Sequence, residues 1–233
     1  MIVTAPFAGP VSFPLLVSKV FNKNDFELKN SCKVNEPGDV VLDSITNVAK
    51  IGLKNYKIVA GVYVKMYSIL GNRSSDKVFT IRRGTLADYN ARLYALITGK
   101  KEVINTTAEE ALRAAEKGEG IAIVGIEVRL ADILEEEFEK LGYLSPQCVI
   151  YSRVNAREVL KAYEEGIKII NERPEEASAI IASASDYYTV ETMRRIIRVY
   201  SHRLTTSRED LEKSLRVYRM VEPLVGDLKI EVI

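Results

Sequence analysis

Candidate ligand-binding residues lie where predicted strands end and predicted helices begin. The segment APFAGPVS places Phe7, Gly9 and Ser12 after the first apolar run, and Asp43 and Ser44 end a later one. Glycine lets the backbone approach a ligand closely, and hydroxyls beside the free N–H groups of a helix start can hold a ligand by hydrogen bonds. These residue types indicate a binding site at strand ends.

The loop APFAGPVS is rich in conformationally restricted residues. Pro6 and Pro10 fix its shape before any ligand arrives, which lowers the ordering cost of binding. A structural explanation stands beside this one, since the two prolines can simply end the strand and Ser12 can cap the helix that follows. The sequence leaves both explanations open.

A charged candidate lies in the segment RRGT, which closes the strand predicted at residues 78–84. An arginine beside a helix N-terminus suits a carboxylate or a phosphate. Because neighbouring strand residues point to opposite faces, at most one of Arg82 and Arg83 should face a ligand, and we assign Arg83 with Gly84 and Thr85. The structural alternative is a solvated surface pair of arginines.

Two further pairs of residues are also candidates, and each pair has a structural explanation as well. Ser44 and Thr46 can bond a ligand or cap the helix predicted at residues 45–55. Gly125 and Glu127 end the strand predicted at residues 120–127. Glu127 can meet a cationic or hydroxylated ligand, or it can pair with the nearby Arg129.

Other kinds of chemistry find little support. The chain has one histidine, His202, which we expect to be structural, and two cysteines, Cys32 and Cys148, which we interpret as small buried side chains. It lacks Cys-x-x-Cys spacing, a Gly-x-Ser-x-Gly elbow and a P-loop. We therefore predict no metal site and no cofactor.

Alternating strands and helices must position these residues. Strands are predicted at residues 1–7, 26–34, 40–42, 56–70, 78–84, 101–106, 120–127 and 145–154. Helices are predicted at residues 11–24, 45–55, 85–100, 107–119, 128–142 and 155–173, from Pro174 onward, and at residues 189–204 and 207–224. Strands separated by helices predict a parallel α/β sheet, and the chain from residue 155 onward predicts helices alone.

Bulk properties narrow the class of partner. A chain of 233 residues can form one large or two small domains, and its net charge of +1 argues against a nucleic-acid partner. No segment reaches the roughly 18 apolar residues of a membrane span. A small-molecule ligand remains the expected partner, and a homodimer stays open.

The N-terminus does not have the pattern of a secretory signal. No basic residue precedes Lys19, and Pro6, Gly9, Pro10 and Pro14 interrupt the apolar run. We predict a cytoplasmic protein, or one whose signal has been removed. A single glutamine among abundant Glu, Lys, Arg and Ile suggests a thermophilic source.

Four segments resemble the type II periplasmic-binding-protein fold, in particular the nitrate/sulfonate/taurine-type solute-binding proteins and their pyrimidine-precursor-binding relatives. The first two are GDVVLDSITNVAKIGLKNYKIVAG and VFTIRRGTLADYNARLYAL, the latter with Gly84 and Thr85 at a turn similar to the family's phosphate-loop-like turn. The others are AEEALRAAEKGEGIAIVGIE and AREVLKAYEEGIKIINERPEEASAIIA. The similarity lies in the order of the predicted elements and in the types of residue within them, along nearly the whole chain.

The resemblance implies a two-lobed α/β protein with a helical C-terminal tail. Lobe one would comprise residues 1–70 plus 149–233 and lobe two residues 71–148, with the chain crossing between them twice. A small metabolite, either anionic or uncharged, would bind in the cleft between the lobes, next to the strand-end residues named above. Ligands of open α/β sheets do collect beyond the carboxyl ends of strands.

Three functional hypotheses share this fold. The first is a solute-binding protein whose lobes close on a small molecule. The second is a cytoplasmic enzyme that resembles futalosine-pathway enzymes of menaquinone synthesis or thiamine-pyrimidine synthases, with Asp43, Glu127 or a tyrosine as the acid or base. The third, a LysR-type effector domain, would need a DNA-binding segment, and the first strand already begins near residue 2.

Overall fold

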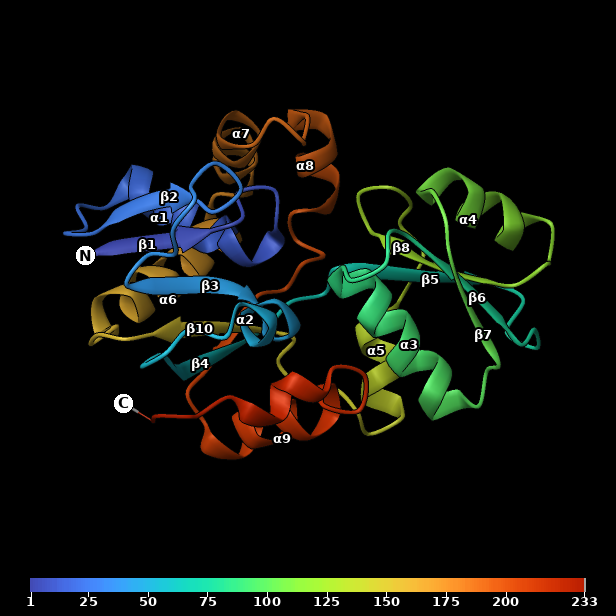
Figure 1. The fold of residues 1–233 in the computed structure, drawn as a ribbon. Coiled ribbons are helices and arrows are strands. Elements are labelled where there is room, and N and C mark those ends of the chain that lie inside the picture. The colour runs from blue at the N-terminus through green and yellow to red at the C-terminus, as the bar shows by residue number, and fades with distance from the viewer. Residues whose placement is uncertain (233) are drawn as a thin grey trace. The chain divides into compact units, whose positions relative to one another are not determined.

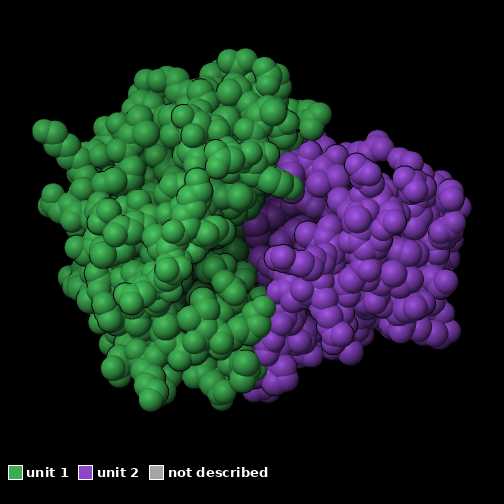
Figure 2. Space-filling view, turned by 45° about the horizontal axis from the view of Figure 1, so that its top comes forward, with its two compact units in different colours: residues 1–64, 145–216, 224–233 green, residues 65–144, 217–223 purple. Residues whose placement is uncertain are grey.

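The chain divides into two compact units, which Figure 2 shows in different colours. The computed structural model describes residues 1–232. Unit 1 comprises residues 1–64, 145–216 and 224–233, and unit 2 comprises residues 65–144 and 217–223. Each unit has its own β-sheet and is described separately.

Unit 1 contains a six-stranded sheet with the order β11-β4-β10-β3-β1-β2, stacked in Figure 1 from β2 through β1, β3 and β10 to β4. Its strands are β1 (Ile2–Ala5), β2 (Glu27–Asn30), β3 (Val40–Ser44), β4 (Lys57–Tyr63), β10 (Cys148–Ser152) and β11 (Arg203–Thr205). β1 is parallel to β2 and β3, whereas β10 is antiparallel to β3 and β4, and β11 is antiparallel to β4.

The prediction of a parallel sheet is therefore wrong for the strand pairs that β10 and β11 form. β10 is buried at every position, from Cys148 to Ser152. A central strand that is buried on both faces is a continuous apolar run whichever way it points, so its composition does not reveal its direction.

Helices cover the unit 1 sheet. They are α1 (Phe13–Phe21), α2 (Ile45–Ile51), α6 (Arg157–Glu172), α7 (Pro174–Ala184), α8 (Val190–Ile196) and α9 (Arg208–Tyr218), with short 3-10 helices at Pro10–Ser12 and Pro223–Asp227. Pro174 is the first residue of α7, as predicted. α1 and α6 pack closely, because a Cβ atom on Gly166 would overlap the Pro14 carbonyl.

Unit 2 contains a five-stranded sheet with the order β7-β6-β8-β5-β9. Its elements are β5 (Tyr67–Gly71), β6 (Lys77–Thr80), α3 (Leu86–Thr98), β7 (Glu102–Asn105), α4 (Ala108–Glu116), β8 (Ile121–Gly125), β9 (Asp132–Ile133) and α5 (Leu134–Lys140). β6 is parallel to β7 and β8, and β5 is antiparallel to β8 and β9. Figure 1 shows α4 on one face of this sheet and α3 and α5 on the other.

Two of the three predicted helix starts of unit 2, at Thr85 and Thr107, are confirmed, whereas the helix predicted from residue 128 begins at Leu134, after β9. The Thr85 hydroxyl accepts the Asp88 N–H at the start of α3. At the start of α4, Thr107 and Glu110 form a reciprocal capping box. These local signals need only neighbouring residues, which is why the sequence reveals them.

Two predicted elements differ from the structure in their extent. The extended stretch at residues 56–70 is two strands, β4 and β5, one in each sheet. The helix predicted at residues 189–204 is shorter in the structure, where α8 ends at Ile196. The chain then forms the short strand β11. Ser201 has a positive φ of 48°, a conformation that breaks a helix and redirects the chain.

The C-terminal segment at residues 217–223 belongs to unit 2, although the resemblance places it in the first lobe. The Tyr218 hydroxyl donates a 2.9 Å hydrogen bond to Asn90 Oδ1 in α3. The Tyr89 hydroxyl donates a 2.6 Å bond to Glu222 Oε2. A segment remote in sequence therefore completes the packing around α3.

Among residues 1–232, no helix has both the length and the apolar character that crossing a membrane requires.

Candidate functional site

In unit 1 the predicted residues gather at one edge of the sheet. β1 and β3 are parallel neighbours, with Val3 opposite Val40 and Thr4 opposite Val41. Their carboxyl ends therefore lie at the same edge. The loop with Phe7, Gly9 and Ser12 follows β1 at this edge, and Asp43, Ser44 and Thr46 lie at the end of β3 and the start of α2.

The loop after β1 is held by its own hydrogen bonds. The Gly9 N–H donates to the Pro6 carbonyl at 2.7 Å, and the Ser12 hydroxyl donates to the Gly9 carbonyl at 2.8 Å. A Cβ atom on Gly9 would lie 2.8 Å from Pro6 Cγ, so the tight turn favours glycine. Ser12 is fully buried and does not cap α1 through its side chain. Its hydroxyl stabilises the loop through the bond to the Gly9 carbonyl.

Three side chains from the second half of the chain hold the loop carbonyls. The Tyr188 hydroxyl donates to Ala8 O at 2.7 Å, and the Tyr163 hydroxyl donates to Val11 O at 2.9 Å. His202 Nε2 lies 2.8 Å from Pro10 O, and since a carbonyl only accepts, this nitrogen carries the proton. Sequence reasoning missed these roles, because no local pattern links residues that are more than 150 positions apart.

His202 is buried beneath the loop, next to the ring of Phe13. Burial lowers the pKa of His202 to about 4, although the bond to the Pro10 carbonyl acts in the opposite direction. The imidazole is thus neutral near pH 7 and serves as a hydrogen-bond donor that fixes the loop.

The polar groups at the end of β3 are largely used within the unit. Ser44 caps α2, because its Oγ accepts the Asn47 N–H at 3.2 Å. Ser44 Oγ also lies 3.3 Å from Thr46 Oγ1. Asp43 accepts the Ser44 N–H at 2.7 Å and an N–H of the Asn47 amide at 2.5 Å. Burial raises the pKa of the Asp43 carboxyl despite these bonds.

Asn30 is a further residue that sequence reasoning missed at this edge. It ends β2, where Ala5 pairs with Asn30, and its Oδ1 accepts the Phe7 N–H at 3.4 Å and the Cys32 N–H at 3.1 Å. Phe7 itself is half-buried. Its side chain helps to line a hollow of about 520 Å³ that also involves α1, β2 and α7.

In unit 2 the predicted residues also share one edge. β6 and β8 are parallel neighbours, with Thr80 opposite Ile123. The RRGT turn follows β6, and Gly125 and Glu127 lie at and just beyond the end of β8. The order β7-β6-β8 repeats the order β2-β1-β3 of unit 1, with all three strands parallel in both cases.

The RRGT turn differs from its prediction in one respect. β6 ends at Thr80, so Arg82 and Arg83 lie in the turn and strand alternation does not assign their faces. Both arginines are exposed, and within residues 1–232 neither forms an ion pair with a carboxylate. Gly84 has a positive φ of 82°, which permits the tight turn into α3.

A buried carboxylate anchors this turn. Asp88 Oδ2 accepts the Gly84 N–H at 2.9 Å, Asp88 Oδ1 accepts an Asn105 amide N–H at 2.8 Å, and Arg92 Nε donates to both oxygens. Burial alone would raise the pKa of Asp88, but the bonds from Arg92, Gly84 and Asn105 outweigh it and hold the pKa below its usual value. Asn105 also donates to Ile81 O at 2.7 Å. Sequence reasoning missed the anchoring role of Asn105.

At the end of β8, the Glu127 carboxylate folds back over Gly125, where a Cβ atom would collide with it. Arg129, the partner that the structural explanation assigned to Glu127, pairs with Glu116 through a 2.7 Å contact between Nη2 and Oε1. Glu127 therefore lies against the backbone at the carboxyl edge of the sheet.

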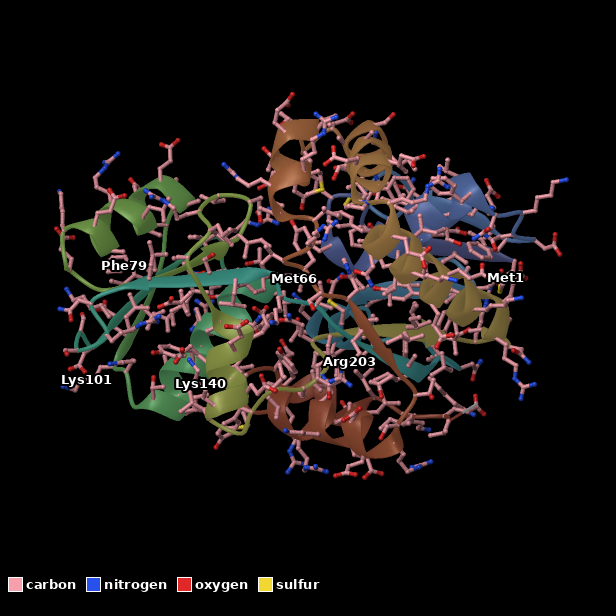
Figure 3. All side chains as sticks on the ribbon, turned by 180° about the vertical axis from the view of Figure 1, so that it is seen from behind. Met1, Met66, Phe79, Lys101, Lys140 and Arg203 are labelled. Carbon is pink, nitrogen blue, oxygen red and sulfur yellow. The ribbon has the colours of Figure 1, made fainter. Side chains whose placement is uncertain are left out.

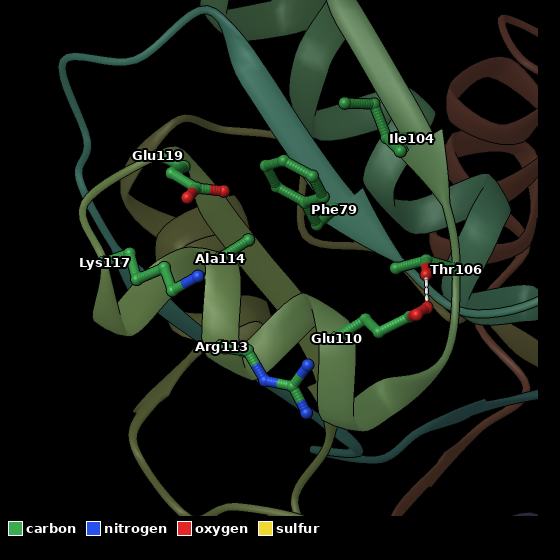
Figure 4. Close-up of a pocket in the computed structure, with 8 residues that line it drawn as sticks. All are labelled: Phe79, Ile104, Thr106, Glu110, Arg113, Ala114, Lys117 and Glu119. Carbon is green, nitrogen blue, oxygen red and sulfur yellow. Dashed lines mark hydrogen bonds between the residues drawn. The ribbon is translucent and has the colours of Figure 1, made fainter.

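A separate hollow of about 270 Å³ lies beside α4 in unit 2 (Figure 4). Its lining residues are Phe79, Ile104, Thr106, Glu110, Arg113, Ala114, Lys117 and Glu119. None of the residues predicted from the sequence lies among them. Its charged residues include both signs, so the lining as a whole does not select for the charge of a ligand.

Comparisons with known proteins agree with this geometry. The family described as "Protein of unknown function (DUF3834)" matches residues 1–203. A protein from Thermoplasma volcanium, named "Putative nitrate transport protein", is 41% identical, with a TM-score of 0.93 over 99% of this chain and 96% of that chain. No curated protein matches the sequence.

More distant solved structures share the fold. An ABC transporter protein from Parabacteroides distasonis is 13% identical, with a TM-score of 0.65 over 99% of this chain and 96% of that one. The periplasmic aliphatic sulphonate binding protein from Escherichia coli is 12% identical, with a TM-score of 0.64 over 94% and 90%. The two-lobed α/β architecture that the resemblance implies is thus confirmed as a type II periplasmic-binding-protein-like fold. The chain belongs to the DUF3834 family, because the family model matches residues 1–203 and the Thermoplasma protein is 41% identical to this chain.

Proposed function

We propose that the protein binds a small, anionic metabolite between the carboxyl edges of its two units, which close on it. One observation carries this proposal: each unit gathers its candidate residues at the carboxyl edge of three parallel strands in the same order. In open α/β sheets, this edge is where ligands bind.

The proposed charge of the ligand follows from the unit 2 edge. Arg82 and Arg83 are exposed in a turn that Asp88 and Gly84 hold in place. Fixed donors beside a helix start suit a carboxylate, phosphate or sulfonate oxygen. The names of two related structures, which mention nitrate and sulphonate, support a small oxyanion.

Closure of the units would select the bound state. Contacts that form only when both edges touch one ligand favour the closed form in proportion to their free energy. Micromolar affinity corresponds to about −8 kcal/mol. Preformed loops lower the ordering cost of reaching that value, and the hydrogen bonds of the loop after β1 are of this kind.

A thermal-shift screen of the purified protein tests the proposal. Nitrate, carboxylates, phosphates and sulfonates would be compared with neutral metabolites, because a ligand that binds the native state raises its melting temperature. Arg83→Gln should abolish the shift given by the oxyanion that stabilises best. Arg82→Gln measures how much the second arginine of the turn contributes to the shift. Arg113→Gln on α4 is a charge-matched control, and its shift should equal that of the wild type.

Two results would contradict the proposal in different ways. If neither Arg82→Gln nor Arg83→Gln reduces the shift, the unit 2 turn does not bind the anion. If a stabilising metabolite is converted to a new product that mass spectrometry detects, the protein is an enzyme. Asp43, whose pKa is raised by burial at the unit 1 edge, would then be the first residue to replace.

A further inference from the structure

The unit 1 edge contains a cation that the sequence patterns do not reveal. Arg203 is the first residue of β11 and pairs with Tyr63, the last residue of β4. β4 and β3 are both antiparallel to β10, and Cys148 pairs with Val62 on one side and with Ser44 on the other. Tyr63 and Arg203 therefore lie one position beyond the row that contains Ser44, at the same carboxyl edge.

The Arg203 side chain, labelled in Figure 3, rests on an aromatic platform. Its guanidinium carbon lies 3.7 Å from the centroid of the Tyr63 ring. The Tyr63 hydroxyl donates to Asp210 Oδ1 at 3.0 Å, and the Thr205 hydroxyl donates to Asp210 Oδ2 at 2.7 Å. Burial and the bond to Asp210 raise the pKa of Tyr63 to about 12, so this hydroxyl remains a donor. Asp210, itself held by Thr205, thus fixes the hydroxyl end of the ring under the guanidinium.

The backbone beside Arg203 connects it to the loop after β1. Ser201 has the positive φ of 48° noted above, a strained conformation for a residue with a side chain. The next residue, His202, contacts the Pro10 carbonyl of that loop. Arg203, one residue further on, turns to Tyr63 instead. The segment at residues 201–203 thus directs the His202 side chain to the loop after β1 and the Arg203 side chain to Tyr63.

The charge of Arg203 is available to a ligand. Its side chain is exposed, and within residues 1–232 it forms no ion pair with a carboxylate. The nearby Asp210 uses one oxygen for Tyr63 and the other for Thr205. A guanidinium stacked on a ring keeps its N–H donors in a fixed plane, which matches the geometry of an oxyanion.

We propose that Arg203, stacked on Tyr63, binds the anionic group of the ligand from unit 1, and that this group is a planar or tetrahedral oxyanion. The inference rests on the proposed function, because it uses the same sheet edge. It goes further by naming a binding residue and the chemical group that this residue recognises. Tyr63 is a positioning residue that acts through Arg203.

Isothermal titration calorimetry tests the inference on the full chain. Acetate, methanesulfonate, phosphate and nitrate would be titrated at constant ionic strength. Comparing their affinities shows which oxyanion group the protein binds best. Arg203→Gln should weaken the probe that binds best by at least about tenfold. Arg198→Gln, an exposed arginine in the same region of the sequence that forms no ion pair within residues 1–232, is the matched control and should leave the affinity unchanged.

Variants of Tyr63 separate a ligand-binding role from a purely structural stack. Tyr63→Phe keeps the ring and should retain most of the affinity, whereas Tyr63→Leu removes the platform and should approach the affinity of Arg203→Gln. Urea unfolding of each variant shows whether it is folded. A stack that only stabilises the fold would change the urea midpoint and leave the affinity as in the wild type.

The possible failures are distinguishable. Wild-type affinity in Arg203→Gln, together with lost affinity in Arg83→Gln, overturns this inference and leaves the proposed function intact. If none of the four probes binds saturably, the inference is also overturned. The proposed binding of a small metabolite would then depend on whether a neutral compound raises the melting temperature of the wild type.

Discussion

At the residue scale, the stability of the loop after β1 depends on the buried His202, whose imidazole is neutral in the folded protein. In the unfolded chain, His202 takes up a proton near its ordinary pKa of 6.5, whereas burial lowers the pKa in the folded protein to about 4. Between these two values the unfolded state holds more protons. The histidine contribution to stability is therefore complete above pH 6.5 and is lost as the pH falls toward 4.

We expect His202 to make the free energy of unfolding fall by about 3 kcal/mol between pH 7 and pH 4. Urea unfolding at several pH values measures this loss. His202→Gln retains a hydrogen-bond donor without a titratable ring, so the difference in stability between wild type and variant should shrink as the pH decreases. A constant difference across this range would contradict the assignment.

Other single residues show what the sequence can and cannot reveal. The caps at Thr85 and Thr107 were predictable, because a cap involves residues three positions apart. The bond between His202 and Pro10 joins residues 192 positions apart, and the Tyr63–Arg203 stack is similarly remote. Such pairs depend on the tertiary fold, and no local pattern specifies them.

At the scale of elements, α1 and α6 approach each other closely. Gly166 lies within α6, and a Cβ atom there would overlap the Pro14 carbonyl of α1. In an open helix, replacing glycine with alanine stabilises by up to about 1 kcal/mol. Here the added methyl group must separate the two helices.

Gly166→Ala should therefore destabilise unit 1 by about 1–3 kcal/mol. Urea unfolding measures the change in the free energy of unfolding. The matched control is Gly226→Ala, because no atom lies within 4 Å of the Cβ position of Gly226. Equal stability of Gly166→Ala and wild type would show that the two helices are not in contact at this point.

The strands also show a limit of sequence reasoning. The apolar runs at β3, β8 and β10 were predicted as strands, and the structure confirms them. The antiparallel direction of β10 was not predictable, since Cys148–Ser152 is buried at every position and has no alternation. The three-residue strand β11 is too short to give a periodic signal, yet it carries Arg203.

For the chain as a whole, the order of strands explains why the candidate residues could be chosen from sequence. Residues after β1 and β3, and residues after β6 and β8, meet because each pair of strands is parallel and adjacent. That pairing follows from a βα repeat, which the sequence does contain. The assignment of residues 217–223 to unit 2 depends on Tyr218 and Glu222 contacting α3, which the sequence does not indicate.

The proposed function requires one ligand to contact both units. Calorimetric titration of the best-binding oxyanion into wild type, Gly9→Val and Arg83→Gln tests this requirement most directly, with circular dichroism to show that each variant is folded. Gly9→Val disturbs the unit 1 loop by crowding Pro6, and Arg83→Gln removes a charge from the unit 2 turn. We predict a single site per chain that both variants weaken. Two independent sites, or a loss confined to one variant, would contradict the account.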